Sequence, residues 1–368
     1  MEEKRRAGIA LLDLTVTNPT QVLPDYPHGR IAQAFGRLQN FNYNPDPFGS
    51  LEARNEIVRL YAQRQVTLTP DRIALTASSS EAYALLFKLL CDPDDEVLVP
   101  APSYPLFEYL AALESVHVRP YRLAYDGSWC LEFAALRSSI TSRTRAIVVV
   151  NPNNPTGSFL KRTEAQRLIE FAREWQLPIV SDEVFMDYAF HDDPHRVETL
   201  ASEDGVLTFC LNGLSKMAAM PQMKLGWIVI SGCEAERQTT RERLELVLDT
   251  YLSVNVPVQA ALSDLILIGD DNRRALKHSI QANRGTLAKL LRGSPIHPLH
   301  ADGGWSAILR LPNVDSEESW IAKLINDAGI LAQPGYFFDM GTEPHVIVSL
   351  ITQPDVFAEG ISRMVTCL

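Results

Sequence analysis

The stretch LTFCLNGLSKMAAMPQMKLGW (residues 207–227) decides the organisation expected for this 368-residue chain. Apolar and β-favouring residues at 206–211 predict a buried strand, which ends in a turn that carries Lys216. A second strand is predicted at 225–230, beyond Pro221. Lysine is seldom fully buried without a partner, so Lys216 either points into water or loses its charge through desolvation. In the second case its amine becomes a nucleophile or a Schiff-base former.

Composition limits the class of protein. The chain is 46% hydrophobic and 21% charged, which is typical of a globular protein, and its length suggests about two domains. A net charge of −11 argues against a general binder of nucleic-acid phosphates. We therefore expect small-molecule partners and no nucleic acid.

The cysteines and the N-terminus indicate a compartment. Five scattered cysteines include no CxxC and no Cys/His pair at zinc spacing, which favours free thiols and no metal site. The apolar run in MEEKRRAGIALLDL is too short for a signal peptide, and no segment approaches the roughly 20 apolar residues of a membrane span. These features predict a cytoplasmic protein.

Strands and helices alternate over about residues 70–235. Strands are predicted at 72–76, 96–100, 116–122, 145–151, 178–180, 206–211 and 225–230, with helices such as 106–114 and 161–176 between them. The alternation predicts an α/β domain with a mostly parallel sheet flanked by helices. The β-branched run at 145–151 indicates a strand that is covered on both faces.

From about residue 235 the pattern changes. Helices are predicted at 236–253, 257–268 and 272–292, followed by strand, helix and strand at 305–311, 318–329 and 346–351 and by a closing helix at 354–365. We predict a large cofactor-binding domain at 45–255. The remaining parts, 1–44 and 256–368, would form a smaller α+β domain with an N-terminal arm.

Ligands of open parallel sheets bind outside the carboxyl ends of the strands. A serine turn, an aromatic ring, an amide, an acid and an amine fall there, each past a different strand: Ser79, Tyr104, Asn154, Asp182 and Lys216. The serine turn opens a helix, where free N–H groups and the helix dipole favour phosphate; ordinary capping by serine is the alternative. Alone, Asp182 could be a cap, the Asn154 loop a turn and Tyr104 a core aromatic. Together the five predict one binding site.

The ordered motifs NPNNPTG (151–157), SDEVF (181–185) and LSK (214–216) resemble the fold-type I pyridoxal-phosphate enzymes. Within these the chain is most similar to the class I/II aminotransferases, from the Tyr43 loop to the Gly303-Gly304-Trp305 strand. The resemblance implies an aspartate-aminotransferase-like fold and the cofactor pyridoxal 5'-phosphate. It also implies ping-pong transfer of an amino group from an amine or amino-acid donor to a keto-acid or carbonyl acceptor, and a homodimer with shared active sites.

The resemblance assigns a role to each residue. Lys216 would bind the cofactor aldehyde as an aldimine and then shuttle a proton, and Asp182 would keep the pyridinium nitrogen protonated. Asn154 would donate to the phenolic oxygen of the cofactor, and Tyr104 would stack on its ring. The phosphate would be held by a larger set, in which the tyrosine reaches across from the neighbouring subunit: Ser79, Ser80, Ser215, Lys224 and Tyr43.

The chain also departs from the family pattern. Phe185 replaces a tyrosine that bonds the phenolic oxygen, and Gly213 stands where a phosphate-binding hydroxyl is more usual. Lys224 replaces a phosphate-binding arginine, which keeps the charge but loses the bidentate fork. Ile347 stands where the family has the arginine that binds the substrate α-carboxylate, a charge-assisted pair.

Three hypotheses follow from Ile347. The carboxylate could be held by other groups, such as Asn18, His345 or a displaced arginine; the donor could lack an α-carboxylate; or the scaffold could serve a lyase or decarboxylase reaction. Transamination is favoured because the cofactor-binding residues are kept. A non-catalytic pyridoxal-phosphate-binding regulator is disfavoured, because the residues before Tyr43 are not basic overall and show no helix-turn-helix pattern.

Overall fold

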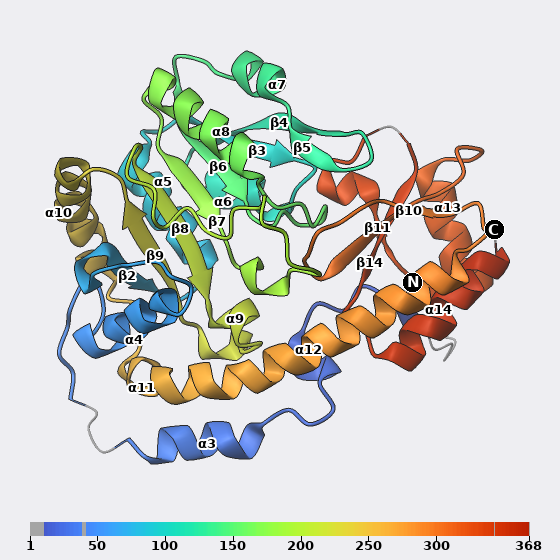
Figure 1. Cartoon of the computed structure of the whole chain (residues 1–368), viewed down its shortest axis with the longest axis horizontal. Coiled ribbons are helices and arrows are strands. Elements are labelled where there is room, and N and C mark those ends of the chain that lie inside the picture. Colours follow the sequence, from blue (N-terminus) through green and yellow to red (C-terminus); the bar gives the residue numbers. More distant parts are fainter. Residues whose placement is uncertain (1–10, 39–41, 342, 368) are drawn as a thin grey trace.

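The computed structural model describes residues 11–38, 42–341 and 343–367 (Figure 1). The parts of the predicted N-terminal arm at 1–10 and 39–41 lie outside this range. The described chain forms a large sheet covered by helices and a smaller sheet beside it, with the long helix α12 running under both (Figure 1). The predicted boundary between two domains at residue 255 stays a prediction.

The large sheet has eight strands in the order β2-β9-β8-β7-β6-β3-β4-β5. Strands β4, β3, β6, β7 and β8 pair in parallel, whereas β9 is antiparallel to both neighbours and β5 is antiparallel to β4. The predicted mostly parallel sheet is therefore confirmed. The strands are β2 (Ile73–Thr76), β3 (Glu96–Ala101), β4 (His117–Tyr125), β5 (Trp129–Leu131), β6 (Thr144–Val150), β7 (Ile179–Asp182), β8 (Thr208–Gly213) and β9 (Gly226–Ser231).

Helices cover both faces of this sheet, which explains why its strands are apolar on both sides. One face packs against α5 (Ser79–Leu90), α6 (Leu106–Leu113) and α10 (Glu234–Tyr251). The other packs against α4 (Leu51–Ala62), α8 (Arg162–Trp175) and α12 (Leu262–Leu290). Neighbouring residues of β6 divide between the two cores: Ile147 lies in the α8 core and Val148 in the α5 core.

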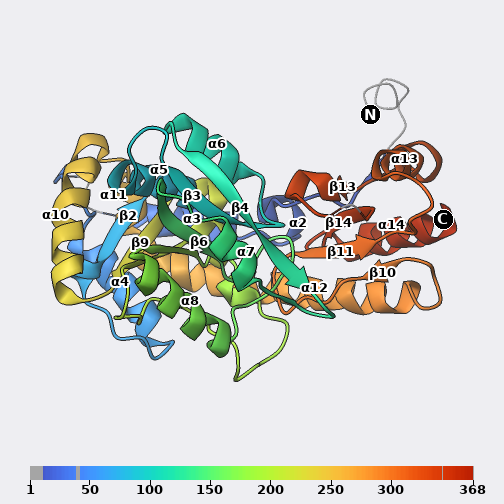
Figure 2. The same ribbon diagram turned by 90° about the horizontal axis from the view of Figure 1, so that it is seen from above.

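The smaller sheet is antiparallel, in the order β10-β11-β14-β13, and lies beside the large one (Figure 2). Its elements are β10 (His297–Pro298), β11 (Ser306–Arg310), α13 (Glu317–Lys323), β13 (Gln333–Pro334), β14 (His345–Ser349) and α14 (Pro354–Cys367). The N-terminal strand β1 (Leu12–Asp13) pairs with β12 (Ile330–Leu331), so the start of the described chain packs on this part. The shorter helical elements are α2 (Pro19–Val22), α3 (His28–Gly36), η1 (Pro70–Arg72), α7 (Phe133–Ser138), η2 (Met186–Tyr188), α9 (Leu214–Met217), η3 (Pro221–Met223), α11 (Val256–Ala260), η4 (Leu324–Ala328) and η5 (Gly335–Phe338).

The prediction of two helices at 257–268 and 272–292, separated by a gap, is wrong. The short helix α11 ends at Ala260, and α12 then runs through residues 269–271 without a break. The predicted gap between the two helices falls at residues 269–271, which read Gly-Asp-Asp. In the structure Gly269 is a packing residue, because a Cβ at this position would lie 2.4 Å from the Cβ of Ala218. The glycine lets α12 approach the turn that carries Lys216.

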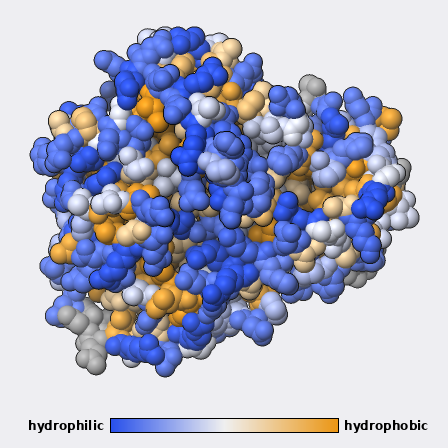
Figure 3. Space-filling view, viewed as in Figure 1, coloured by the Kyte–Doolittle hydropathy of each residue, from blue (hydrophilic) through white to orange (hydrophobic). Residues whose placement is uncertain are grey.

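The surface is mainly polar. Hydrophilic residues cover most of the face seen in Figure 3, and apolar residues form smaller patches between them. In the described part of the chain, no helix combines the length and the apolar character needed to span a bilayer.

The packing of α12 against the Lys216 turn gives a prediction about stability. We expect Gly269→Ala to lower the free energy of unfolding by about 1–3 kcal/mol, because the new methyl group overlaps Ala218. Gly285→Ala, in the same helix with open space around it, is the matched control and should stabilise the protein by about 0.5–1 kcal/mol. Thermal and denaturant unfolding of both variants measures the difference. Equal effects of the two substitutions would contradict the packing role of Gly269.

Candidate active site

A cavity of about 300 Å³ lies at the carboxyl ends of the parallel strands. The five strand-end residues predicted to converge all line it: Ser79, Tyr104, Asn154, Asp182 and Lys216. Four further predicted cofactor contacts line it as well: Ser80, Phe185, Ser215 and Lys224. The sheet thus brings together groups that are far apart in the sequence.

Lys216 lies on α9, which begins where β8 ends. Its Nζ is 5.0 Å from the centre of the Trp305 ring and 5.7 Å from the centre of the Phe185 ring. Burial lowers the pKa of the Lys216 ammonium, although the charge of Asp182 opposes the shift. A lysine that gives up its proton more readily is a better nucleophile, as Schiff-base chemistry requires.

Asp182 ends β7 and is buried in the same cavity. Burial raises the pKa of its carboxyl group to about 6, while the Val184 N–H, the Tyr83 hydroxyl and the charge of Lys216 favour the ionised form. The Val184 N–H donates to Oδ1 at 3.2 Å, and the Tyr83 hydroxyl donates to Oδ2 at 3.1 Å. The carboxylate is therefore fixed in orientation and ionised at neutral pH.

The serine turn before α5 caps the helix and also lines the cavity, so the two interpretations of this turn are compatible. The Ser78 hydroxyl caps the helix by accepting a bond from the Glu81 N–H at 3.1 Å. The N–H groups of Ser79 and Ser80, in the first turn, have no carbonyl partner within the helix. Both serines line the cavity together with Lys224. Free N–H groups beside a basic side chain suit an anionic group such as phosphate.

The cavity is also lined by the amide of Asn154 and by aromatic side chains. The Ser306 hydroxyl donates to Asn154 Oδ1 at 3.2 Å, which leaves the amide N–H groups of Asn154 available for a bound oxygen. Tyr104 is 47% exposed at the mouth of the cavity, where its ring can cover a flat ligand. Much of the remaining wall is apolar: Leu106, Phe107, Leu110, Val150, Val184 and Trp305.

Three residues predicted as substrate contacts lie outside this lining. Asn18 caps α2, where its side chain accepts bonds from the Thr20 N–H and hydroxyl. His345 is buried and donates from Nδ1 to the carbonyl of Glu343 at 2.7 Å. Ile347 is only 1% exposed and packs in an apolar cluster with Trp129, Ile308, Phe338 and Met340.

Tyr43, predicted to reach the phosphate of a neighbouring subunit, lies on the surface of its own chain. It is 71% exposed and borders a different groove, beside Tyr251 and Ser253. Tyr43 is not among the residues that line its own cavity, which is compatible with action across a subunit interface; that role stays a prediction.

Two of the departures from the family pattern have a structural reason. A Cβ at Gly213 would lie 2.8 Å from the Cα of Gly226, so the close pairing of β8 and β9 leaves no room for a hydroxyl-bearing side chain. Phe185 packs edge-on against Trp305, with ring centres 5.3 Å apart. Phe185 thus makes an apolar contact at the position where the family pattern has the hydroxyl group of a tyrosine.

Sequence reasoning missed several residues of the site, namely Thr17, Tyr83, Val184 and Ser306 as lining residues and Trp305 as its aromatic wall. Tyr83 follows Ser79 by one helical turn, a spacing that places both on one side of α5. That spacing could have identified it. Trp305 belonged to a recognised motif, but nothing in the sequence showed that its ring faces Lys216.

The residues of the cavity fit pyridoxal 5'-phosphate. The half-buried Lys216, with its lowered pKa, would take the aldehyde and Asp182 the ring nitrogen. Asn154 would take the phenolic oxygen, and the start of α5 with Lys224 the phosphate. The fold and the cavity therefore define a pyridoxal-phosphate enzyme of the aspartate-aminotransferase type.

Comparison with known proteins identifies the family. Residues 12–356 match the family Aminotransferase class I and II, and the chain belongs to this family. It is 32% identical to the glutamate-pyruvate aminotransferase AlaA of Escherichia coli K12 over 258 residues, which are 69% of this chain and 63% of that enzyme. It is 28% identical to an alanine aminotransferase of Mycobacterium tuberculosis H37Rv over 381 residues, with 97% of this chain and 85% of the other covered.

A solved structure supports the same assignment. The alanine aminotransferase of Pyrococcus furiosus superimposes with a TM-score of 0.89 at 25% identity, over 99% of this chain and 94% of the other. The family, the aspartate-aminotransferase-like fold and the cofactor predicted from the sequence are confirmed.

The contact between Tyr83 and Asp182 gives a second prediction. We expect Tyr83→Phe to raise the pKa of Asp182 further above about 6, because the ionised carboxylate loses a hydrogen-bond donor. A bond to a charged group contributes about 1.5–3 kcal/mol, which corresponds to roughly one pKa unit or more. Carboxyl-carbon NMR titration of the cofactor-free protein measures the shift. Tyr121→Phe, whose buried hydroxyl donates to the Val148 carbonyl instead, is the control. An unchanged Asp182 titration in Tyr83→Phe would refute the contact.

Proposed function

We propose that this chain transfers amino groups from an amine or amino-acid donor to a carbonyl acceptor, with Lys216 as the cofactor-binding amine. The observation that carries the proposal is the pairing of the buried Asp182 with the half-buried Lys216 in one cavity. Lys216 has a lowered pKa there, and Asp182 is held ionised by Tyr83 and Val184. Desolvation makes the Lys216 amine easier to deprotonate, as a nucleophile requires, and the donors to Asp182 oppose the effect of burial and favour the carboxylate that a protonated ring nitrogen needs.

When bound, pyridoxal phosphate supplies an electron sink for the carbon that bears the amino group. Asp182 would hold a proton on the ring nitrogen, and the neutral amine of Lys216 would accept and return the proton of the donor carbon. Asn154 and Tyr104 would fix the plane of the ring, and the α5 amides its phosphate. Trp305 and Phe185 exclude water from the side of the amine.

The names of the relatives support transamination over the lyase and decarboxylase alternatives. Both sequence relatives described above are aminotransferases, and one is named for glutamate and pyruvate. Amino-group transfer by this chain remains our proposal, because the match spans 63% of the Escherichia coli enzyme.

We further propose that the donor lacks an α-carboxylate. Lys216 and Lys224 are the cations in the described lining of the cavity, and both are engaged by the proposed cofactor contacts. The strand position that would offer a guanidinium carries Ile347, which is packed among apolar residues. A buried carboxylate without a cationic partner is costly, so an amine with an apolar group and no carboxylate fits the cavity better.

A homodimer in the cytoplasm completes the proposal. The exposed Tyr43 and the groove that it shares with Tyr251 support a surface that a second copy covers. The five cysteines are free in the structure, which fits a reducing compartment.

The assignment of Lys216 is tested by Lys216→Ala. We expect turnover to fall by about three orders of magnitude or more, because the nucleophile is lost. Borohydride reduction should add the mass of the cofactor to the peptide containing residue 216 in the wild type and not in the variant. Lys289→Ala, at the exposed end of α12, is the control and should keep both activity and labelling. Labelling of another lysine in the wild type would show that the assignment is incorrect.

The donor class is tested with a matched panel of compounds that differ only in the α-carboxylate, such as benzylamine with phenylglycine and phenethylamine with phenylalanine. We expect the amines to be turned over with kcat/KM at least about tenfold higher, because no guanidinium offsets the desolvation of a carboxylate. Release of CO₂ from the amino acids would reveal a decarboxylase. Preference for the amino acids would reject the carboxylate-free donor while leaving transamination intact.

A further inference from the structure

We propose that Lys161 is a positioning residue for the substrate side of the active site. It holds residues 300–306, the segment that brings Trp305 and Ser306 to the cavity. The inference rests on the proposed function, because its effect is on the binding of the amino donor. It concerns a cluster of charged groups behind the cavity wall, none of which lines the cavity.

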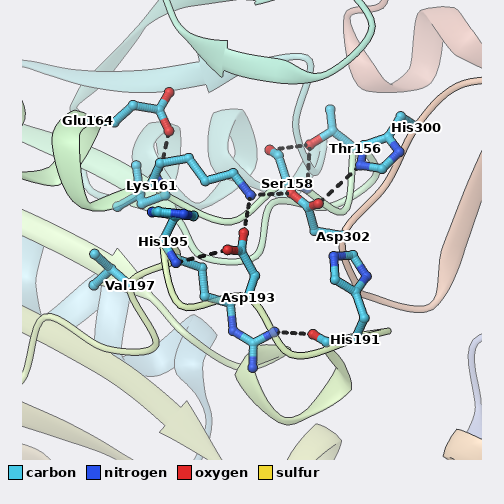
Figure 4. Close-up of polar contacts among 12 residues, drawn as sticks. Thr156, Ser158, Lys161, Glu164, His191, Asp193, His195, Val197, His300 and Asp302 are labelled. Carbon is cyan, nitrogen blue, oxygen red and sulfur yellow. Dashed lines mark hydrogen bonds and ion pairs between the residues drawn. The ribbon is translucent and has the colours of Figure 1, made fainter.

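Lys161 lies between two carboxylates from distant parts of the chain (Figure 4). Its Nζ donates to Asp193 Oδ2 and to Asp302 Oδ2, both at 3.1 Å. The backbone N–H of Lys161 donates to Glu164 Oε2 at 2.8 Å, which fixes the residue at the start of α8. The ammonium group thus ties the 193 loop and the 302 loop to a rigid helix.

The backbone around Asp302 is hydrogen-bonded to Gly157, four residues before Lys161. The N–H groups of Asp302 and Gly303 both donate to the carbonyl of Gly157, at 3.0 and 2.9 Å. The packing is close, because a Cβ at Gly157 would lie 2.3 Å from the Gly303 carbonyl oxygen. Small displacements of residues 302–303 are therefore resisted by contacts on one side and by the Lys161 ion pair on the other.

Removing the ammonium group would leave Asp193 and Asp302 facing each other. The two side chains are only 19% and 12% exposed, so their mutual repulsion is incompletely screened. Asp193 would keep the His195 N–H at 2.8 Å, and Asp302 would keep His300 Nε2 at 3.1 Å, but neither group bridges the two loops. Backbone bonds from the Phe190 N–H to the Asp302 carbonyl at 2.9 Å and from the Gly304 N–H to the Tyr188 carbonyl at 3.0 Å would remain, and the repulsion would shift the Asp302 side chain against them.

Such a movement reaches the active site within a few residues. Trp305 lies 5.0 Å from Lys216 Nζ, and the Ser306 hydroxyl bonds Asn154 at 3.2 Å. The Ser79–Ser80 turn and Lys224, on the phosphate side, belong to other elements and are not partners in the Lys161 ion pairs. Displacement of residues 300–306 should therefore weaken donor binding, while the phosphate contacts that hold the cofactor are kept.

The test compares Lys161→Met with Lys161→Arg in the holoenzyme. We expect Lys161→Met to raise the donor KM about tenfold with kcat within about threefold, because a misplaced wall reduces binding more than chemistry. Lys161→Arg retains the bridge and should restore KM to within about twofold of the wild type. Arg137→Met, which removes the exposed ion pair between Arg137 on α7 and Glu174 on α8, is the control for loss of an ion pair and should leave KM unchanged.

Hydrogen exchange of the cofactor-free protein gives a readout without activity. The peptide covering 300–306 should exchange faster in Lys161→Met than in the wild type, while the peptide covering α5 should not change. A wild-type KM in Lys161→Met, or a loss of cofactor absorbance and kcat in parallel with KM, would overturn the inference. If the wild type transfers no amino group at all, the proposed function fails, and unaltered exchange at 300–306 would separately reject the anchoring role of Lys161.

Discussion

The desolvation of Asp182 and Lys216 in one cavity is the constraint on which the site depends. Desolvation raises the pKa of the carboxyl group and lowers that of the ammonium group, so burial works against the charge of both. The fold offsets part of this cost with neighbouring donors to Asp182 and with the attraction between the two charges. The same desolvation leaves Lys216 easier to deprotonate, so the strain that burial places on the folded state is what makes the amine reactive.

The turn that carries Lys216 is held from several directions. The Tyr188 hydroxyl donates to the carbonyl of Lys216 at 2.7 Å, and Asn272 Nδ2 on α12 donates to the carbonyl of Ala218 at 3.1 Å. The absence of a side chain at Gly269 lets α12 come close enough for the second bond. An ordinary helix thus contributes to the site through its backbone spacing rather than through a catalytic side chain.

The sequence was sufficient for the large sheet and for the residues at its strand ends. Parallel strands must place their carboxyl ends at one edge, so Asn154 and Asp182 could be brought together without any knowledge of the loops. Side chains such as Tyr83 and Trp305 were missed as parts of the site, because their direction depends on packing against distant elements. The sequence pattern also gave a wrong helix boundary near Gly269, because a residue that usually weakens a helix here allows close packing.

The missing guanidinium shows why local pattern cannot identify the substrate. Ile347 is directly opposite Ile308 in the small sheet, and both pack in the cluster that includes Phe338 and Met340. An arginine there would have to bury its charge in this cluster or displace it, so the apolar residues and the isoleucine form one consistent unit. The isoleucine at position 347 is therefore accompanied by apolar neighbours. A guanidinium at residue 347 would therefore be surrounded by the side chains of Trp129, Ile308, Phe338 and Met340, an environment that disfavours a charge.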